Sequence, residues 1–224
     1  MKNVEQIKEK IAKSAEKSGR KYNDITVVCA TKTRDIDTVE GILRHGFCAA
    51  GENRVQELLS KFRAVEGLEW QFIGQLQTNK VKFIVDKVSL IQSADRLSLV
   101  REIDKECAKI GKVMPVLAEA DFARTEGRGG VAADGALIDF VNEISAFKNV
   151  KVCGLMTILP VKEDRQLLAN YCKEMNALFE RAKAECPEAE MRYLSMGMSD
   201  DFEVAIENGA NMIRLGRILF GGRN

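Results

Sequence analysis

The sequence predicts an α/β fold, specifically a single (β/α)8 TIM barrel, on three observations. Short apolar runs alternate with longer amphipathic segments along most of the chain, which is typical of parallel strands joined by crossover helices. Eight such runs fit within 224 residues, and this number favours a closed barrel over an open doubly wound sheet. No linker or low-complexity tract interrupts the pattern, so we expect residues 1–224 to form one domain.

The elements follow in a regular order. The predicted strands are 25–31, 47–51, 69–74, 89–94, 114–120, 151–158, 191–196 and 211–216. The predicted crossover helices are 35–45, 53–65, 79–87, 95–110, 134–147, 163–185 and 199–208. An amphipathic helix at about 1–19 precedes them, with Val4, Ile7 and Ile11 on its apolar side. Because no full helix pattern follows the last strand, we expect this N-terminal helix to fill that place in the outer ring.

An open sheet with a nucleotide crevice is the alternative fold. Its usual signatures are absent from the sequence, because no G-x-G-x-x-G follows the first strand and no G-x-x-x-x-G-K-[ST] occurs anywhere. The barrel is therefore the favoured prediction.

Composition excludes several classes of function. Lys and Arg number 34 against 33 Asp and Glu, a balance that predicts neither nucleic acid nor an anionic membrane as a partner. No apolar stretch reaches the roughly 18 residues of a membrane span, and the N-terminus lacks a signal peptide's apolar region, so we expect a cytoplasmic protein. The six cysteines lack C-x-x-C spacing and are interpreted as buried reduced thiols. With His45 as its one histidine, the chain predicts no histidine triad and no metal site.

Candidate site residues are those at the carboxyl ends of the predicted strands, where such barrels carry their active sites. Lys32 follows the first strand in "VVCATKT". A partly desolvated lysine there could attack an aldehyde as the neutral amine and form a Schiff base; the alternative is an ordinary solvated lysine. Other polar residues at strand ends are Glu52, Asn53, Arg54, Gln75, Gln77, Asn79, Ser93, Asp95, Glu119, Asp121 and Thr157.

Two segments near the end of the chain indicate a phosphate site. In "LSMGMSDDFEVAIENGA" (194–210), Ser195 and Ser199 supply hydroxyl groups and Gly197 permits close backbone approach. The alternative is plain helix capping by Ser199. In "NMIRLGR", alternation places Arg214 inside the barrel if Ile213 and Leu215 face the helices.

Arg214 has its own alternative, pairing with an inner carboxylate such as Glu119. The segment "FARTEGRGG" (122–130) is interpreted as a loop in which Arg124 and Arg128 could meet an anion. These parts together describe a barrel that holds a phosphorylated carbonyl compound, with Lys32 on one side and a phosphate cradle opposite.

Several strings together resemble the pyridoxal phosphate homeostasis proteins, which are similar to the N-terminal barrel of alanine racemase. They are "ATKTR", "GENRVQEL", "FIGQLQTNKVK", "GLMTI" and "LSMGMSDDFEVAIENGANMIRLGRILFG". The resemblance implies pyridoxal 5′-phosphate (PLP) as a Schiff base on Lys32, with Asn53 and Thr157 lining the pocket and Arg214 facing the pyridine nitrogen. It also implies phosphate contacts from Ser195, Gly197, Ser199, Gly216 and Arg217, by side chain or backbone.

The resemblance implies a role in vitamin B6 and amino-acid balance without established catalytic turnover. We expect a monomer whose partners are PLP and PLP-dependent apo-enzymes. A PLP-dependent racemase and a phosphosugar-binding barrel are the alternatives. The sequence ends at Asn224, soon after the eighth predicted strand, so we expect no second domain of the racemase kind. Thr31 stands where relatives more often have serine. The segment 119–130 departs from the family pattern, with Arg128 where relatives usually have a lysine. Because an arginine does not form a Schiff base at neutral pH, we expect no cofactor transfer through this position.

Overall fold

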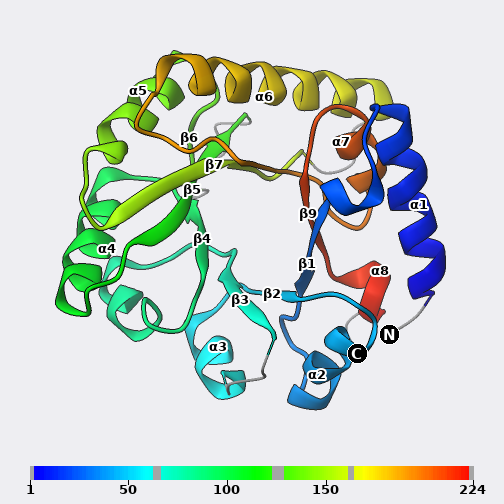
Figure 1. The fold of residues 1–224 in the computed structure, drawn as a ribbon, viewed down its shortest axis with the longest axis horizontal. Helices are drawn as coiled ribbons and strands as arrows, with labels where there is room; N and C mark the ends of the chain where they lie inside the picture. Colours follow the sequence, from blue (N-terminus) through cyan, green and yellow to red (C-terminus); the bar gives the residue numbers. More distant parts are fainter. Residues whose placement is uncertain (1–2, 63–66, 123–128, 161–163, 222–224) are drawn as a thin grey trace.

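The computed structural model describes residues 3–62, 67–122, 129–160 and 164–221, and its strands form a closed parallel barrel (Figure 1). The strands of the ring are β1 (Thr26–Ala30), β2 (Ala49–Glu52), β3 (Glu69–Phe72), β4 (Leu90–Ala94), β5 (Met114–Asp121), β7 (Val150–Thr157), β8 (Tyr193–Ser195) and β9 (Met212–Leu215). Each pairs in parallel with the next, and β9 pairs with β1 to close the ring. The predicted fold class is confirmed.

A short extra strand, β6 (Val131–Ala132), pairs with the end of β5 and lies outside the ring of eight. The sequence pattern did not predict it. Its two residues extend the β5 edge just beyond Ala120, at the end of the barrel where the strands finish.

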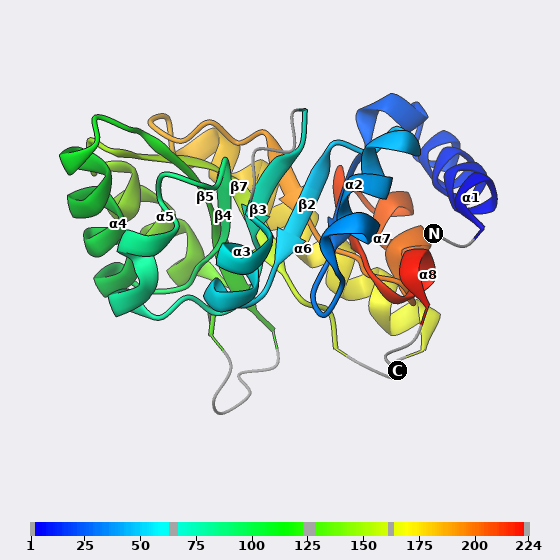
Figure 2. The ribbon, with the colours of Figure 1, turned by 90° about the horizontal axis from the view of Figure 1, so that it is seen from below.

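Helices surround the strands (Figures 1 and 2). They are α1 (Val4–Lys17), α2 (Ile36–Arg44), α3 (Val55–Lys61), α4 (Leu97–Lys109), α5 (Gly135–Ser145), α6 (Arg165–Glu185), α7 (Phe202–Glu207) and α8 (Arg217–Phe220). Two 3₁₀ helices, η1 (Tyr22–Asp24) and η2 (Thr78–Phe83), complete the set.

The predicted α-helix at 79–87 is wrong, because η2 occupies that crossover and ends at Phe83. The segment carries Val81, Ile84, Val85 and Val88, all buried, and branched residues such as valine and isoleucine form α-helix less readily than straight-chain ones. A tight 3₁₀ turn followed by an irregular stretch places these side chains against the core instead.

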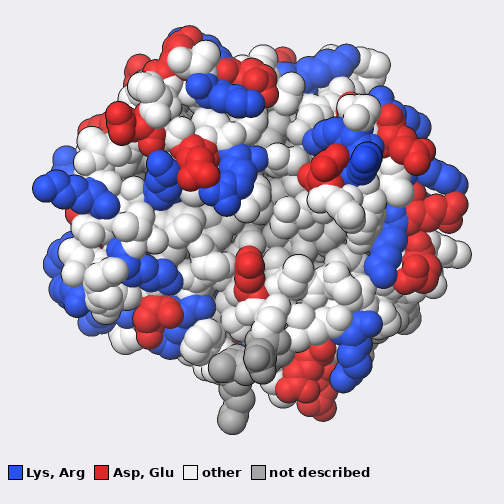
Figure 3. Space-filling model, in the orientation of Figure 1, with Lys and Arg blue, Asp and Glu red and all other residues white. Residues whose placement is uncertain are grey.

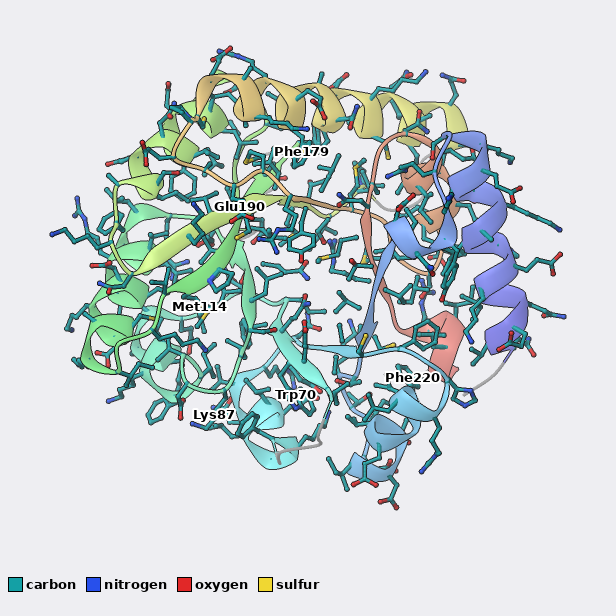
Figure 4. All side chains as sticks on the ribbon, viewed as in Figure 1. Trp70, Lys87, Met114, Phe179, Glu190 and Phe220 are labelled. Atoms are coloured by element: carbon teal, nitrogen blue, oxygen red, sulfur yellow. The ribbon has the colours of Figure 1, made fainter. Side chains whose placement is uncertain are left out.

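Two apolar clusters result from alternation along the strands. The larger one lies between strands and helices and includes Trp70 of β3 and Phe179 of α6 (Figure 4). The smaller one fills the barrel, with Val28, Ala49, Ile73, Leu90, Leu117, Cys153, Met156 and Met212. Side chains at the carboxyl ends of the strands therefore lie above a packed apolar interior.

The N-terminal helix completes the outer ring, as the sequence predicts. In Figure 1, α1 lies beside α7 and α8, where the final crossover helix of a regular barrel would stand. Ile7 and Ile11 are buried on its inner side. Beyond its end, Arg20 donates to the carbonyl oxygens of Ile206, Gly209 and Ala210 at 2.5, 3.2 and 2.9 Å, respectively. These contacts satisfy carbonyl groups at the end of α7 and fix α1 to it.

The surface and the cysteines are mostly as expected. Acidic and basic side chains are interspersed around the rim of the face shown in Figure 3, and its centre is mainly uncharged. No helix of the described residues is long and apolar enough to span a membrane. All six cysteines are free and five are buried, but the expectation of burial is wrong for Cys48, which is exposed.

We expect Ile11→Ala to lower the free energy of unfolding by about 2–5 kcal/mol, because Ile11 is fully buried between α1 and the barrel. Ile110→Ala is the matched control, since Ile110 is 49% exposed and should change stability little. Urea titration of both variants measures the difference. Equal effects would mean that α1 is not part of the cooperative fold.

Candidate functional site

Lys32 lies in the turn that leaves β1, at the carboxyl end of the strand. Alternation along β1 puts Val28 and Ala30 on the inner side of the barrel, and Lys32 is next in that series. Its side chain is exposed, so the expectation of partial desolvation is wrong for the protein as the structure shows it. Lys32 and Ala30 line a cavity of about 80 Å³ together with Gly216 and Arg217.

Gly216 and Arg217 belong to the junction between β9 and α8. Because β9 pairs with β1, this junction and the Lys32 turn come from neighbouring strands of the closed barrel. A Cβ atom at Gly216 would stand 3.4 Å from both the Cβ and the carbonyl oxygen of Ala30. The Arg217 side chain is exposed and donates to Asp200 in the loop after β8. The backbone at Gly216 therefore approaches the cavity closely.

The loop after β8 lies against the start of α8. Ser199 accepts a hydrogen bond from the backbone N–H of Ile218 at 3.2 Å, which links the two segments that carry the predicted phosphate contacts. Gly197 has φ +97°, and a Cβ atom there would stand 2.7 Å from the Cβ of Ala205. Only glycine fits this position without displacement.

The alternative of capping by Ser199 is wrong. Helix α7 begins at Phe202, and the residue in the N-cap position is Asp201. Asp201 accepts a hydrogen bond from the backbone N–H of Met198 instead of bonding to the helix's own first turn. The Ser199 hydroxyl therefore does not cap α7 and instead contacts the start of α8.

Arg214 lies inside the barrel, as alternation predicts, with Ile213 and Leu215 in the outer cluster. It is 4% exposed, and its guanidinium donates to three oxygen atoms. Nη1 donates to the Ser195 carbonyl at 3.0 Å and to its hydroxyl at 2.6 Å, while Nη2 donates to the Thr157 carbonyl at 2.7 Å. The side chain is therefore fixed in one orientation.

Burial lowers the pKa of Arg214 to about 10, although the charges of Glu119 and Asp201 oppose the shift. The arginine stays cationic at neutral pH. The charge of Glu119 favours the cationic form of Arg214, while the guanidinium donates hydrogen bonds to Ser195 and Thr157.

Ser195 and Thr157 are buried, and the hydroxyl of each makes a hydrogen bond inside the protein. Ser195 is fully buried, and its hydroxyl donates to Gln92 Oε1 at 2.7 Å while accepting from Arg214. Thr157 is also fully buried, and its hydroxyl donates to the Ala120 carbonyl at 2.8 Å. Both residues hold Arg214 in place, Ser195 by hydroxyl and carbonyl and Thr157 by its carbonyl.

Asn53 follows β2 on the same inner side as Gly51. Its Oδ1 atom is buried and has no hydrogen-bond partner among the described residues. The Asn53 backbone packs so closely on Gly74 that a Cβ atom there would stand 2.3 Å from the Asn53 carbonyl oxygen. A buried amide oxygen without a donor is an open acceptor position at this end of the barrel.

Two functional candidates escaped the sequence analysis because they lie within strands. Gln92 of β4 donates to Gln71 of β3 at 2.6 Å and accepts from Ser195. Together with Arg214 they form a polar layer across the barrel. The signal was available: both glutamines occupy inner positions of apolar strands, where a polar residue must find partners.

Other predicted residues lie elsewhere around the barrel mouth. Gln75, Gln77 and Asp95 line a separate, larger cavity with Gly129, away from Lys32. Arg124 and Arg128 lie outside the described residues. No group of three or more metal-ligating side chains is found in the described part of the chain.

The arrangement suits a phosphorylated aldehyde. A lysine amine and a glycine-rich backbone junction share one cavity, and a serine hydroxyl and an arginine lie close to that junction. Amines condense with aldehydes, whereas backbone amides, hydroxyls and cations bind phosphate.

Comparison with known proteins first gives the class of domain to which the barrel belongs. A family model described as "Alanine racemase, N-terminal domain" matches residues 3–224, which spans every element of the barrel.

Relatives then narrow the class. A pyridoxal phosphate homeostasis protein of Aquifex aeolicus (strain VF5) is 41% identical, over 98% of this chain and 96% of that protein. One from Synechocystis sp. is 35% identical, over 89% of this chain and 92% of that protein. PipY of Synechococcus elongatus PCC7942, solved with PLP bound, has a TM-score of 0.82 at 25% identity, covering 94% of this chain and 100% of that chain. The chain therefore belongs to the family of pyridoxal phosphate homeostasis proteins.

The Asp201 carboxyl gives a pH-dependent prediction. Burial raises its pKa, more than the Met198 N–H and the charge of Arg214 lower it. Between the unfolded and folded pKa values the folded protein binds more protons, so stability falls as pH rises through the folded value. We expect Asp201→Asn to be more stable than the parent at pH 7, with a gain that disappears in acid. Thermal unfolding from pH 3 to 8 measures it.

Asp200→Asn is the control, because the Asp200 side chain is 70% exposed and pairs with an exposed arginine. At pH 7 it should change the free energy of unfolding by no more than about 1 kcal/mol, because an exposed ion pair contributes little. A gain for Asp201→Asn that is the same at pH 3 and pH 7 would contradict the assignment of the effect to ionisation.

Proposed function

We propose that this protein binds pyridoxal 5′-phosphate through a Schiff base on Lys32 and takes part in intracellular PLP and amino-acid homeostasis. The observation that carries the proposal is the shared cavity of Lys32, Gly216 and Arg217, which sets an amine beside a backbone junction. The names of the relatives and the PLP bound in PipY support it. In the Schiff base, the neutral amine adds to the aldehyde carbon and water leaves as the C=N bond forms.

The phosphate group is held by the two linked segments after β8 and β9. Ser199 offers its hydroxyl, Gly197 and Gly216 offer backbone without side-chain obstruction, and Arg217 offers a cation. Ser195 takes part in phosphate binding through its backbone, because its hydroxyl already makes hydrogen bonds with Arg214 and Gln92.

The polar layer of the barrel would lie beneath the ring of the cofactor. Arg214 would face the pyridine nitrogen, and because a guanidinium cannot accept a proton it would leave that nitrogen unprotonated. The ring is then a weak electron sink, whereas PLP enzymes that rely on a strong sink place a carboxylate at this position. Asn53 lines the pocket and offers its Oδ1 atom as an acceptor. Thr157 lies at the base of the pocket, where its carbonyl accepts a hydrogen bond from Arg214.

This chemistry fits storage and delivery of the cofactor better than turnover. We propose a cytoplasmic monomer in which residues 1–224 act as one cofactor-binding domain, with PLP-dependent apo-enzymes as recipients. The relatives are named as homeostasis proteins, which supports this role.

Labelling tests the anchor. We expect the purified protein to turn yellow with PLP and borohydride to fix the label on Lys32, as located by peptide mass mapping. Lys32→Ala should lose the label, and Lys13→Ala should keep it, because Lys13 is an exposed residue of α1. Label on another lysine would remove Lys32 from the site. Absence of colour with added PLP would favour a barrel that binds another phosphorylated compound.

An amino-acid racemase is the second candidate, favoured by the family model of the alanine racemase N-terminal domain. Exchange of the α-hydrogen of L-alanine for deuterium in heavy water separates the two functions. We expect no exchange above that of Lys32→Ala. Rapid exchange that requires Lys32 would establish the enzyme instead.

A further inference from the structure

The residues around Lys32 form a tight turn with an unfavourable conformation. The backbone N–H of Arg34 donates to the Thr31 carbonyl at 3.0 Å, so Lys32 and Thr33 are the two central residues of a four-residue turn. Thr33 has φ +63°, a left-handed value that is costly for a branched side chain and is normally taken by glycine at this position. Such a conformation persists only where the surroundings hold it.

Charged side chains of α3 hold both peptide groups beside Lys32. Glu57 accepts from the backbone N–H of Thr33 at 2.7 Å. Lys61 Nζ donates to the Thr31 carbonyl at 2.8 Å. The two side chains lie 3.6 Å apart, so a single ion pair spans the turn from the helix side of the barrel.

Glu52 closes this network from β2. Its Oε1 accepts from Lys61 Nζ at 2.8 Å and from the Thr31 hydroxyl at 2.6 Å, and the Glu52 side chain is fully buried. Thr31 and Glu52 both point outward at the ends of neighbouring strands, opposite to Lys32. The network therefore touches the turn without entering the cavity.

A buried ion pair is an expensive way to stabilise a fold, because apolar residues of similar volume often do as well or better. Lys61 is 7% exposed and Glu52 is not exposed at all. Groups of this kind can instead fix one conformation among several. Here the conformation fixed is that of the residues flanking the proposed cofactor lysine.

We propose that Glu57 and Lys61, supported by Glu52, are positioning residues that hold the turn 31–34 so that the Lys32 amine faces the cavity. The proposal rests on the proposed function in naming Lys32 as the group that is positioned. Its structural half, the restraint of Thr33, holds with or without a cofactor.

A double-mutant cycle in the loaded protein tests the positioning. We expect Glu57→Ala to weaken PLP binding by roughly tenfold, equivalent to about 1.4 kcal/mol. Glu57→Gln should retain most of the affinity, because the amide oxygen still accepts from Thr33. In the Lys32→Ala background, where PLP binds only through non-covalent contacts, Glu57→Ala should change affinity little. An equal loss in both backgrounds would overturn the proposal.

Amide exchange in the protein without added cofactor gives an independent measurement. We expect the Thr33 amide to exchange at least tenfold faster in Glu57→Ala and near the parent rate in Glu57→Gln. Glu5→Ala, an exposed change on α1, is the control. Unchanged Thr33 exchange in Glu57→Ala would show that Glu57 does not restrain the turn.

The double variant Glu52→Gln/Lys61→Met removes the buried pair together, which avoids leaving one charge without its partner. We expect it to fold, to exchange Thr33 faster and to label more slowly at Lys32 with PLP and borohydride; labelling at the parent rate would overturn the role of Lys61. Failure of the proposed function would appear separately, as absence of Lys32 labelling in the parent protein.

Discussion

A cationic side chain enclosed within a barrel must find acceptors there, and Arg214 imposes this constraint on the centre of the structure. Its guanidinium is satisfied by Ser195 and by the Thr157 carbonyl. The Ser195 hydroxyl then needs an acceptor of its own, which Gln92 supplies, and Gln92 in turn donates to Gln71. One charge thus engages polar groups on four other strands, three of them by side chains and β7 by the Thr157 carbonyl, just below the end of the barrel where the proposed ligand lies.

A second constraint acts outside the ring. The pair of Glu52 and Lys61 lies between β2 and α3, and Lys61 donates to the Thr31 carbonyl beside Lys32. The inner layer and the outer pair therefore approach the same site from opposite sides of the strands. Neither the polar layer nor the ion pair buries much apolar surface. The cost of removing their charges from water is offset by the two hydrophobic clusters around them.

Much of this could be predicted from the sequence, because alternation and strand ends are local properties. The barrel, the inner position of Arg214, the place of Lys32 after β1 and the role of α1 in the outer ring all follow from them. What could not be predicted depends on partners distant in sequence. The phosphate contact of Ser195 stays a prediction, and the hydrogen bonds of its hydroxyl with Arg214 and Gln92 could not be predicted from the sequence. Gln71 and Gln92 lie within strands, and their partners come from other strands. The contact of Lys61 with the Thr31 carbonyl depends on how α3 packs on β2. The crossover at Thr78–Phe83 is a 3₁₀ helix because the packing of Val81, and of Ile84, Val85 and Val88 after it, overrode the helical pattern.

The pairing of β1 with β9 has a consequence for folding kinetics. Thr26 of β1 is in register with Met212 of β9, so ring closure joins segments that are very far apart along the chain. Contacts of such high sequence separation form late, because the loop entropy must be lost before they contribute. The cavity between Lys32 and Gly216 spans this same seam, so it comes into existence only when the ring closes. A ligand bound there stabilises the closed barrel alone, so the proposed cofactor would hold the first and last strands together and reduce the population of molecules with an open seam.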